Sequence, residues 1–245
     1  QRLDEALELA LTLVELAPSS SETWTNLMAI RVDLKDWDAM VEDAEQALAR
    51  FPLDPVLFYF HGIALRETQQ NAQSVKAFKS GLNVLLDNPV LEGAMASQLG
   101  WAYRNIGELD LSEKAFERSI GAIEDAIVLN NHAYFLATRK DVEATPARLQ
   151  RALECSTRAN ELAPNEGNFM DTQAHVLFMM GSYDEALQWI LAAQDHGMSG
   201  DAVALEHEGD IRWELGQKNA ARDVWRQAIE NGGDQDVLQR KIDRQ

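Results

Sequence analysis

The chain has 245 residues, of which 46% are apolar and 25% charged, a composition typical of a folded protein. Its formal charge is −18, from 40 acidic and 22 basic residues, and this excess disfavours nucleic acid and anionic membrane surfaces as partners. The one cysteine, Cys155, excludes an internal disulfide and a cysteine-only metal site.

The beginning of the sequence leaves the compartment open. The first residue is Gln1 rather than Met, and it lies inside a helical pattern, so we interpret the chain as a fragment or a processed form. No apolar run approaches the roughly 18 residues that a membrane span needs. The sequence is compatible with the cytoplasm, with the periplasm, or with membrane association through a missing N-terminal segment.

A repeat runs through the whole chain. Pro18 and Pro52 each follow a segment rich in alanine and leucine, and they are 34 residues apart. Residues 1–17 predict a single helix, and six pairs of helices follow. In chain order their signature residues are Trp24, Leu27, Met28, Ala44 and Pro52; Phe58, Gly62, Leu65, Phe78 and Gly81; Ala96, Leu99, Gly100, Tyr103 and Phe116; Leu129, Ala133, Leu136, Ala152, Ala159 and Pro164; Met170, Ala174, Leu177, Gly181, Ala186 and Ile190; Gly209, Gly216, Ala221, Trp225 and Ala228. A last helix is expected over residues 234–244.

This pattern resembles that of tetratricopeptide-repeat proteins, in which small residues let two helices approach closely and large residues fill the gaps between them. The resemblance implies an all-α fold, a right-handed α-solenoid of about six full repeats. A partial repeat at residues 1–17 would precede them and a capping helix at residues 234–244 would follow. We expect one domain over residues 1–245, truncated at its N-terminus, and a bacterial source.

Several positions refine this expectation. Gly107, Gly181 and Gly216 fall where the paired helices turn, and Thr145 is expected to cap a helix that begins with proline. About seven extra residues near 138–145 predict a longer loop inside the fourth repeat. Glu208 and Arg212 depart from the family's preferences, and they are four residues apart, so we expect them to pair on the helix surface.

The resemblance also implies a ligand groove, lined by the first helix of each pair. In repeats four to six the implied groove positions are Ile127, Asn130, Tyr134, Ala137, Asn168, Asp171, His175, Phe178, Val203, Glu206, Asp210 and Trp213. From the whole groove we select as candidate ligand-binding residues Tyr59, Arg66, Trp101, Arg104, Asn130, Tyr134, His175, Phe178 and Trp213. Aromatic and arginine side chains are frequent hot spots in interfaces, and an asparagine amide can hold a peptide backbone.

Two other interpretations of this aromatic series stay open. The rings could pack against a neighbouring repeat, or the chain's own C-terminal helix could fill the groove. The residues Thr25, Ala29, Phe60, Ala94 and Gln98 stand where a family clamp for acidic chaperone tails has lysine, asparagine and arginine, so that partner is not expected.

The sequence predicts no catalytic site, no metal site and no cofactor. None of the five histidines forms a H-E-x-x-H pair, and no glycine-rich phosphate loop occurs. We interpret His61 and His132 as core residues.

The leading hypothesis is therefore a protein-binding scaffold or adaptor that holds a peptide or protein segment in its groove. The alternatives are self-assembly through exposed repeat ends, with Leu3, Leu7, Ala10 and Val14 as an open apolar face, and a regulatory module of a larger enzyme.

Overall fold

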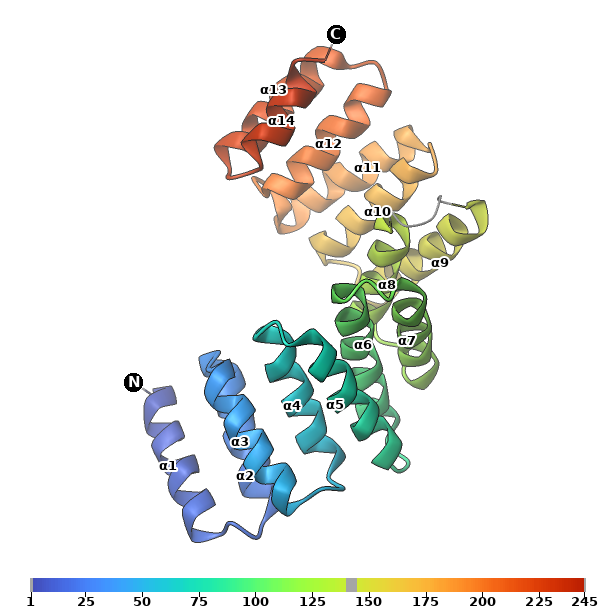
Figure 1. Cartoon of the computed structure of the whole chain (residues 1–245). Coiled ribbons are helices and arrows are strands. Elements are labelled where there is room, and N and C mark those ends of the chain that lie inside the picture. The colour runs from blue at the N-terminus through green and yellow to red at the C-terminus, as the bar shows by residue number, and fades with distance from the viewer. Residues whose placement is uncertain (1, 140–144, 245) are drawn as a thin grey trace. The chain divides into compact units, whose positions relative to one another are not determined.

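The computed structural model describes residues 2–139 and 145–244, and over these ranges it contains fourteen α-helices, one π-type turn and no strand. The helices are α1 (Arg2–Leu16), α2 (Ser21–Leu34), α3 (Trp37–Arg50), α4 (Pro55–Glu67), α5 (Asn71–Val84), α6 (Pro89–Asn105), α7 (Leu109–Ala122), α8 (Ala126–Thr138), α9 (Pro146–Leu162), α10 (Gly167–Met179), α11 (Tyr183–Ala193), α12 (Ala202–Glu214), α13 (Lys218–Glu230) and α14 (Gln235–Ile242), with the turn η1 (Gln194–Met198) after α11. The all-α repeat fold is confirmed (Figure 1). The longer loop expected near 138–145 includes residues 140–144, which lie outside the described residues.

The helices form two compact units, residues 1–124 (unit 1) and residues 125–245 (unit 2). Unit 1 contains α1 to α7 and unit 2 contains α8 to α14. One continuous superhelix over residues 1–245 stays a prediction.

Within each unit the helices pack as antiparallel pairs. The pairs are α2/α3, α4/α5 and α6/α7 in unit 1, and α8/α9, α10/α11 and α12/α13 in unit 2. Each first helix also contacts the first helix of the next pair, through α2–α4, α4–α6, α8–α10 and α10–α12. The first helices of a unit therefore share one layer, which is the arrangement that the groove hypothesis requires.

Local sequence signals fix where the helices begin and end. Asp54, Asn88, Asp125, Thr145, Asp201 and Asp234 each precede a helix and accept a hydrogen bond from a backbone N–H of its first turn. The cap predicted at Thr145 is thus confirmed. Gly107, Gly181 and Gly216 have φ angles of 81°, 80° and 77°, the left-handed conformation expected at the turns between paired helices.

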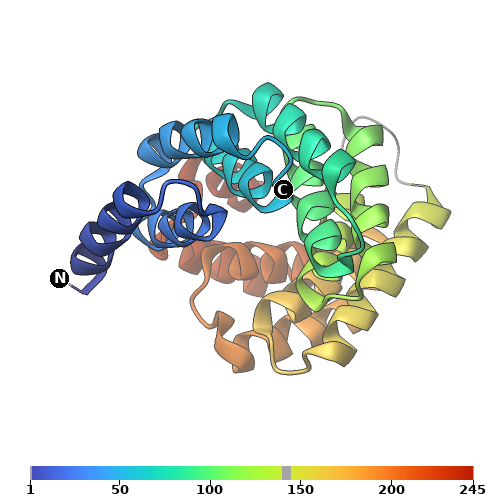
Figure 2. The ribbon, with the colours of Figure 1, turned by 90° about the horizontal axis from the view of Figure 1, so that it is seen from below.

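The apolar face of α1 that was expected to be open is partly covered in the structure. Ala10 is buried, and Val14 packs against the core residues around Trp24, so the predicted open face is the one that meets α2. Leu3 of the predicted face is exposed, and the most exposed apolar residues of α1 are Leu9, Leu13 and Leu16, with exposed fractions of 66%, 48% and 77%. Leu9, Leu13 and Leu16 recur at helical spacing and therefore form one stripe on α1. Figure 2 shows the backbone of α1 at the N-terminus of the chain.

The pair Glu208–Arg212 forms, with 2.5 Å between Arg212 Nε and Glu208 Oε1. The expectation that it lies on the helix surface is wrong for Glu208, which is buried. Its second oxygen accepts a hydrogen bond from Gln194 Nε2 at 2.5 Å. A buried carboxylate needs such partners, because leaving it unpaired costs several kcal/mol, roughly.

Candidate functional site

The candidate ligand-binding residues divide between the two units. In unit 1, Tyr59 and Arg66 lie on α4, and Trp101 and Arg104 lie on the neighbouring α6. In unit 2, α8 carries Asn130 and Tyr134, α10 carries His175 and Phe178, and α12 carries Trp213.

The rings of unit 1 are half-buried and pack within their own helix pair. Tyr59 lies 6.5 Å from Phe78 of α5 between ring centroids, and Trp101 meets Phe116 of α7 edge to face at 5.4 Å. Burial raises the pKa of the Tyr59 hydroxyl. These contacts give the rings a packing role inside the pair, which differs from the packing between repeats considered above.

The two arginines of unit 1 contact groups of their own helices. Arg104 lies over the Trp101 ring, with 5.2 Å from Cζ to the centroid. Arg66 pairs with the adjacent Glu67 at 2.5 Å. A partner's carboxylate would have to displace Glu67 to take the role predicted for Arg66.

In unit 2 four of the candidate residues come together on two adjacent helices. The His175 ring lies between Tyr134 and Phe178, at centroid distances of 6.2 Å and 6.3 Å. Asn130 lies one turn before Tyr134 on α8. We call Asn130, Tyr134, His175 and Phe178 the α8–α10 face.

His207 of α12 is a neighbour of this face that the sequence analysis missed. Its ring centroid is 4.5 Å from that of His175, and its Nδ1–H donates to Asp171 Oδ1 at 2.8 Å. His207 follows the implied groove position Glu206 directly, and this adjacency was the only signal that could have found it.

The two imidazoles differ in charge because their surroundings differ. Burial, together with the charge of His207, lowers the pKa of His175 to about 4, although the charge of Asp171 opposes this shift. Burial also disfavours the charged form of His207, but the hydrogen bond and charge of Asp171, with Asp210 and Glu206, raise its pKa above the ordinary value. His175 is therefore neutral at neutral pH.

The C-terminal helix covers the α12 end of unit 2. Lys241 Nζ of α14 lies 2.6 Å from Glu206 Oε1 and 2.6 Å from Asp210 Oδ2, and both carboxylates occupy implied groove positions. Lys241 of the C-terminal helix thus contacts two implied groove positions, and the filling of the groove by this helix stays a prediction.

Trp213 belongs to the same packed region. Its ring lies 5.4 Å from that of Trp225, and Lys218 Nζ and Arg222 Cζ lie 4.3 Å and 5.3 Å from its centroid. These contacts of Trp213 are with α13 and not with the α8–α10 face. Ligand binding by Trp213 stays a prediction.

A cavity of about 460 Å³ opens beside the α8–α10 face, at the beginning of α8 and α10. It is lined by Asp125, Ala126, Ile127, Asn130, Asn131, Ala163, Glu166, Asn168 and Phe169. Three of these, Ile127, Asn130 and Asn168, are implied groove positions. Asn130 is only 7% exposed, and its Oδ1 has no hydrogen-bond partner. An unpaired buried acceptor of this kind is costly unless a ligand satisfies it.

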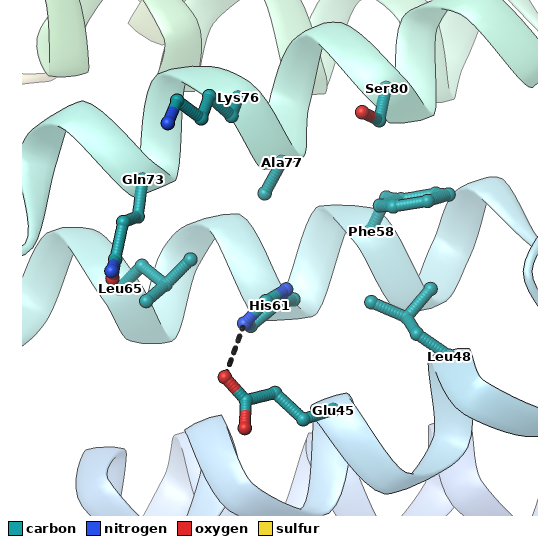
Figure 3. A pocket seen from close by; sticks show the side chains of 9 residues that line it. All are labelled: Glu45, Leu48, Phe58, His61, Leu65, Gln73, Lys76, Ala77 and Ser80. Carbon is teal, nitrogen blue, oxygen red and sulfur yellow. Dashed lines mark ion pairs between the residues drawn. The ribbon is translucent and has the colours of Figure 1, made fainter.

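Unit 1 has a second cavity, of about 310 Å³, between α3, α4 and α5. Figure 3 shows Phe58 and Leu48 at one end of this cavity and Leu65 beside Gln73 at the other. His61 lies between them and is directed toward Glu45, with 4.0 Å between Nε2 and Oε1. His132 is fully buried as predicted, whereas His61 lines this cavity. Because His61 and Tyr59 are two residues apart on a helix, the cavity lies on the opposite side of α4 from the candidate residues.

Within residues 2–139 and 145–244, no group of three or more His, Cys, Asp or Glu side chains is arranged to hold a metal ion. None of the described helices has the length and apolarity that crossing a membrane requires.

Two sequence models of tetratricopeptide repeats match parts of the chain. A sequence model of the tetratricopeptide repeat-like domain matches residues 132–244, and one of the tetratricopeptide repeat matches residues 95–125. A search of curated protein sequences found no match.

Solved structures resemble the chain at low sequence identity. The Cut9–Hcn1 hetero-tetramer of the APC/C has a TM-score of 0.76 at 12% identity, covering 99% of this chain, which spans 46% of that one. A tetratricopeptide repeat protein from Parabacteroides merdae has a TM-score of 0.67 at 15% identity, with 98% and 91% of the two chains covered. YrrB, described as a tetratricopeptide-repeat protein with an unusual peptide-binding site, has a TM-score of 0.61 at 17% identity, with 82% and 97% covered. At these identities the likeness concerns the fold.

Proposed function

Because the chain belongs to the tetratricopeptide-repeat family, we propose that it is a protein–protein interaction scaffold that binds a segment of a partner protein on the α8–α10 face. Proteins of this family bind protein partners, and the family is typically non-catalytic. The family relationship supports the general role, and the choice of face rests on residues of this chain.

One observation carries the choice of face. A half-buried row of Tyr134, His175 and Phe178 adjoins a cavity that Asn130 lines, and the buried Oδ1 of Asn130 has no hydrogen-bond partner. Half-buried aromatic rings give a partner a large contact area at little cost in side-chain entropy. An unpaired amide oxygen offers a hydrogen bond that a backbone N–H or a side-chain donor of the partner can complete.

The similarity to YrrB supports the proposal only at the level of the fold. That protein is described as having a peptide-binding site, but 17% identity does not transfer its binding residues to this chain. A peptide as the ligand is therefore a proposal from the α8–α10 face itself.

The test selects peptides from a random library displayed on phage, using the intact chain as bait. Selected peptides are synthesised, and their affinities are measured for the wild type and for Asn130→Ala and Tyr134→Ala. The matched controls are Gln150→Ala and Gln188→Ala, exposed positions on the second helices α9 and α11 of the same unit. Circular dichroism checks that each variant remains helical.

We expect the two variants of the face to weaken binding about tenfold or more, and the two controls to leave it unchanged. If the peptides bound all four variants as tightly as the wild type, the α8–α10 face would not be the ligand site. If no peptide were selected, a peptide-binding function would be contradicted.

A second candidate function is self-association, and the stripe of Leu9, Leu13 and Leu16 favours it. These side chains are 48–77% exposed on one side of α1. An apolar stripe of this kind gains free energy when a partner surface covers it.

A further inference from the structure

The cavity beside the α8–α10 face is negatively charged. We infer that it receives a lysine or arginine side chain of the bound protein segment, an inference that rests on the function proposed above. Asp125 and Glu166 contribute two carboxylates to its lining, and no lining residue among those described is basic. Neither carboxylate has an ion-pair partner elsewhere in the described part of the chain.

The positive N-terminal ends of α8 and α10 at the cavity do not cancel its negative charge. Asp125 and Glu166 immediately precede α8 and α10, and a helix N-terminus carries about half a positive charge. Two ends therefore offset about one of the two negative charges. Asp125 Oδ1 accepts the N–H of Val128 at 3.0 Å, whereas the Glu166 side chain makes no hydrogen bond to its helix. Glu166 thus keeps its full acceptor capacity for a ligand.

Asn130 supplies an independent reason for a ligand that donates hydrogen bonds. Asn130 is 7% exposed and lines the cavity, and its buried Oδ1 has no hydrogen-bond partner. An ammonium brings three N–H donors and a guanidinium five, so either can satisfy Oδ1 and a carboxylate together. An apolar side chain would leave Oδ1 unpaired, and an acidic side chain would meet two like charges.

The remaining walls fit the aliphatic part of such a side chain. Ile127 is 61% exposed at the cavity, and Phe169 is buried beneath it. Asn160 holds the first turn of α10 by donating from Nδ2 to the Phe169 carbonyl at 3.1 Å. Lysine and arginine lay their methylene groups along apolar surface while the charged end reaches polar partners. The 460 Å³ volume lies within the roughly 300–1,000 Å³ of ligand pockets.

The experiment uses the peptides selected on the intact wild-type chain. The first readout is whether lysine or arginine is enriched at one position over the unselected library. The second is the affinity of such a peptide for the double variant Asp125→Asn/Glu166→Gln. This variant removes both charges but keeps the cap, because asparagine caps a helix as well as aspartate does. Each peptide is also made with norleucine in place of its basic residue.

We expect the basic peptide to lose about tenfold or more in affinity for the double variant, and the norleucine peptide to lose little. The gap between the two peptides should shrink as salt rises. Peptides without an enriched basic residue that bind the double variant normally, yet bind Tyr134→Ala weakly, would overturn this inference and leave the proposed function standing. Failure to select any peptide would overturn both.

Discussion

A β-carbon placed on Gly209 would lie 2.3 Å from Cδ1 of the Trp225 ring, so α12 and α13 are in contact through a glycine and an indole. Trp225 is fully buried and cannot swing aside. We expect Gly209→Ala to destabilise unit 2 by about 1–3 kcal/mol, because overpacking forces a shift of the ring or of the helices. Urea denaturation followed by circular dichroism measures the change.

Gly121→Ala is the control for this substitution. Gly121 is inside α7, and nothing lies within 4 Å of the position of its missing β-carbon. Alanine there should be neutral or should stabilise the protein by up to about 1 kcal/mol. The variant Trp225→Phe should recover part of the loss in Gly209→Ala, since the smaller ring leaves space. Additive effects in the double variant would contradict direct packing of the two side chains.

The same relationship explains how far the fold could be predicted. Gly62 and Phe78, Gly100 and Phe116, and Gly209 and Trp225 are each 16 residues apart, and each glycine lies against its aromatic ring. In the first repeat the sizes are exchanged, because Met28 and Ala44, also 16 residues apart, share one core cluster. A small residue and a large residue at this fixed spacing can be recognised in the sequence. This pattern is why the helix pairs could be predicted.

The candidate site was predictable only where it follows the repeat. Tyr134, His175 and Phe178 came together because equivalent positions of adjacent first helices lie side by side. Lys241 of α14 contacts Glu206 and Asp210, which are 35 and 31 positions away, and α14 has no counterpart in the repeat. The cavity at Asn130 depends on how far side chains fill the space between helices, which the repeat pattern does not specify.

Acid should destabilise unit 2 through His175. Its pKa is lowered to about 4 in the folded protein, against about 6.5 unfolded, so the unfolded state takes up the proton first. The contribution of neutral His175 to the free energy of unfolding is present above pH 6.5 and is lost as the pH falls towards 4. Between pH 7.0 and 5.2 this loss is about 1.5 kcal/mol. His207 has a raised pKa, so its contribution is constant over the acid part of this range and decreases only at higher pH.

The variant His175→Phe tests this assignment. Phenylalanine preserves a ring between Tyr134 and Phe178 and removes the titrating group. Urea midpoints at the two pH values should fall less in the variant than in the wild type. Equal falls would mean that the acid sensitivity comes from other groups, such as the carboxylates that both proteins share.

Removing the Lys241 charge should loosen α14. Lys241→Met keeps the aliphatic stem but leaves Glu206 and Asp210, four residues apart on one side of α12, without their ammonium partner. We expect a loss of about 2 kcal/mol. Hydrogen exchange should become faster in α14 than in α8 or α10. Arg240→Met is the control, because Arg240 is exposed and, among the residues that the structure describes, donates to the Asp236 carbonyl of its own helix alone.

Self-association through α1 should depend on the apolar stripe. Leu9, Leu13 and Leu16 form one stripe on α1, while Ala10, outside this stripe, is buried and Val14 packs on the core around Trp24. Substituting Leu9→Gln/Leu13→Gln therefore changes the exposed stripe and leaves the packed side intact. We expect the wild type to dimerise with rising concentration in sedimentation equilibrium, and the double variant to weaken dimerisation about tenfold or more.

The pair Glu8→Gln/Glu15→Gln is the control, since both glutamates are exposed on α1 but lie outside the stripe. It reduces the net charge of −18 by two, and lower repulsion between copies should leave association unchanged or slightly stronger. A wild type that stays monomeric at every concentration would remove self-association as a function of this stripe. Dimerisation that persists in Leu9→Gln/Leu13→Gln would assign the contact to another surface, because the two glutamines expose polar groups where burial had favoured the dimer.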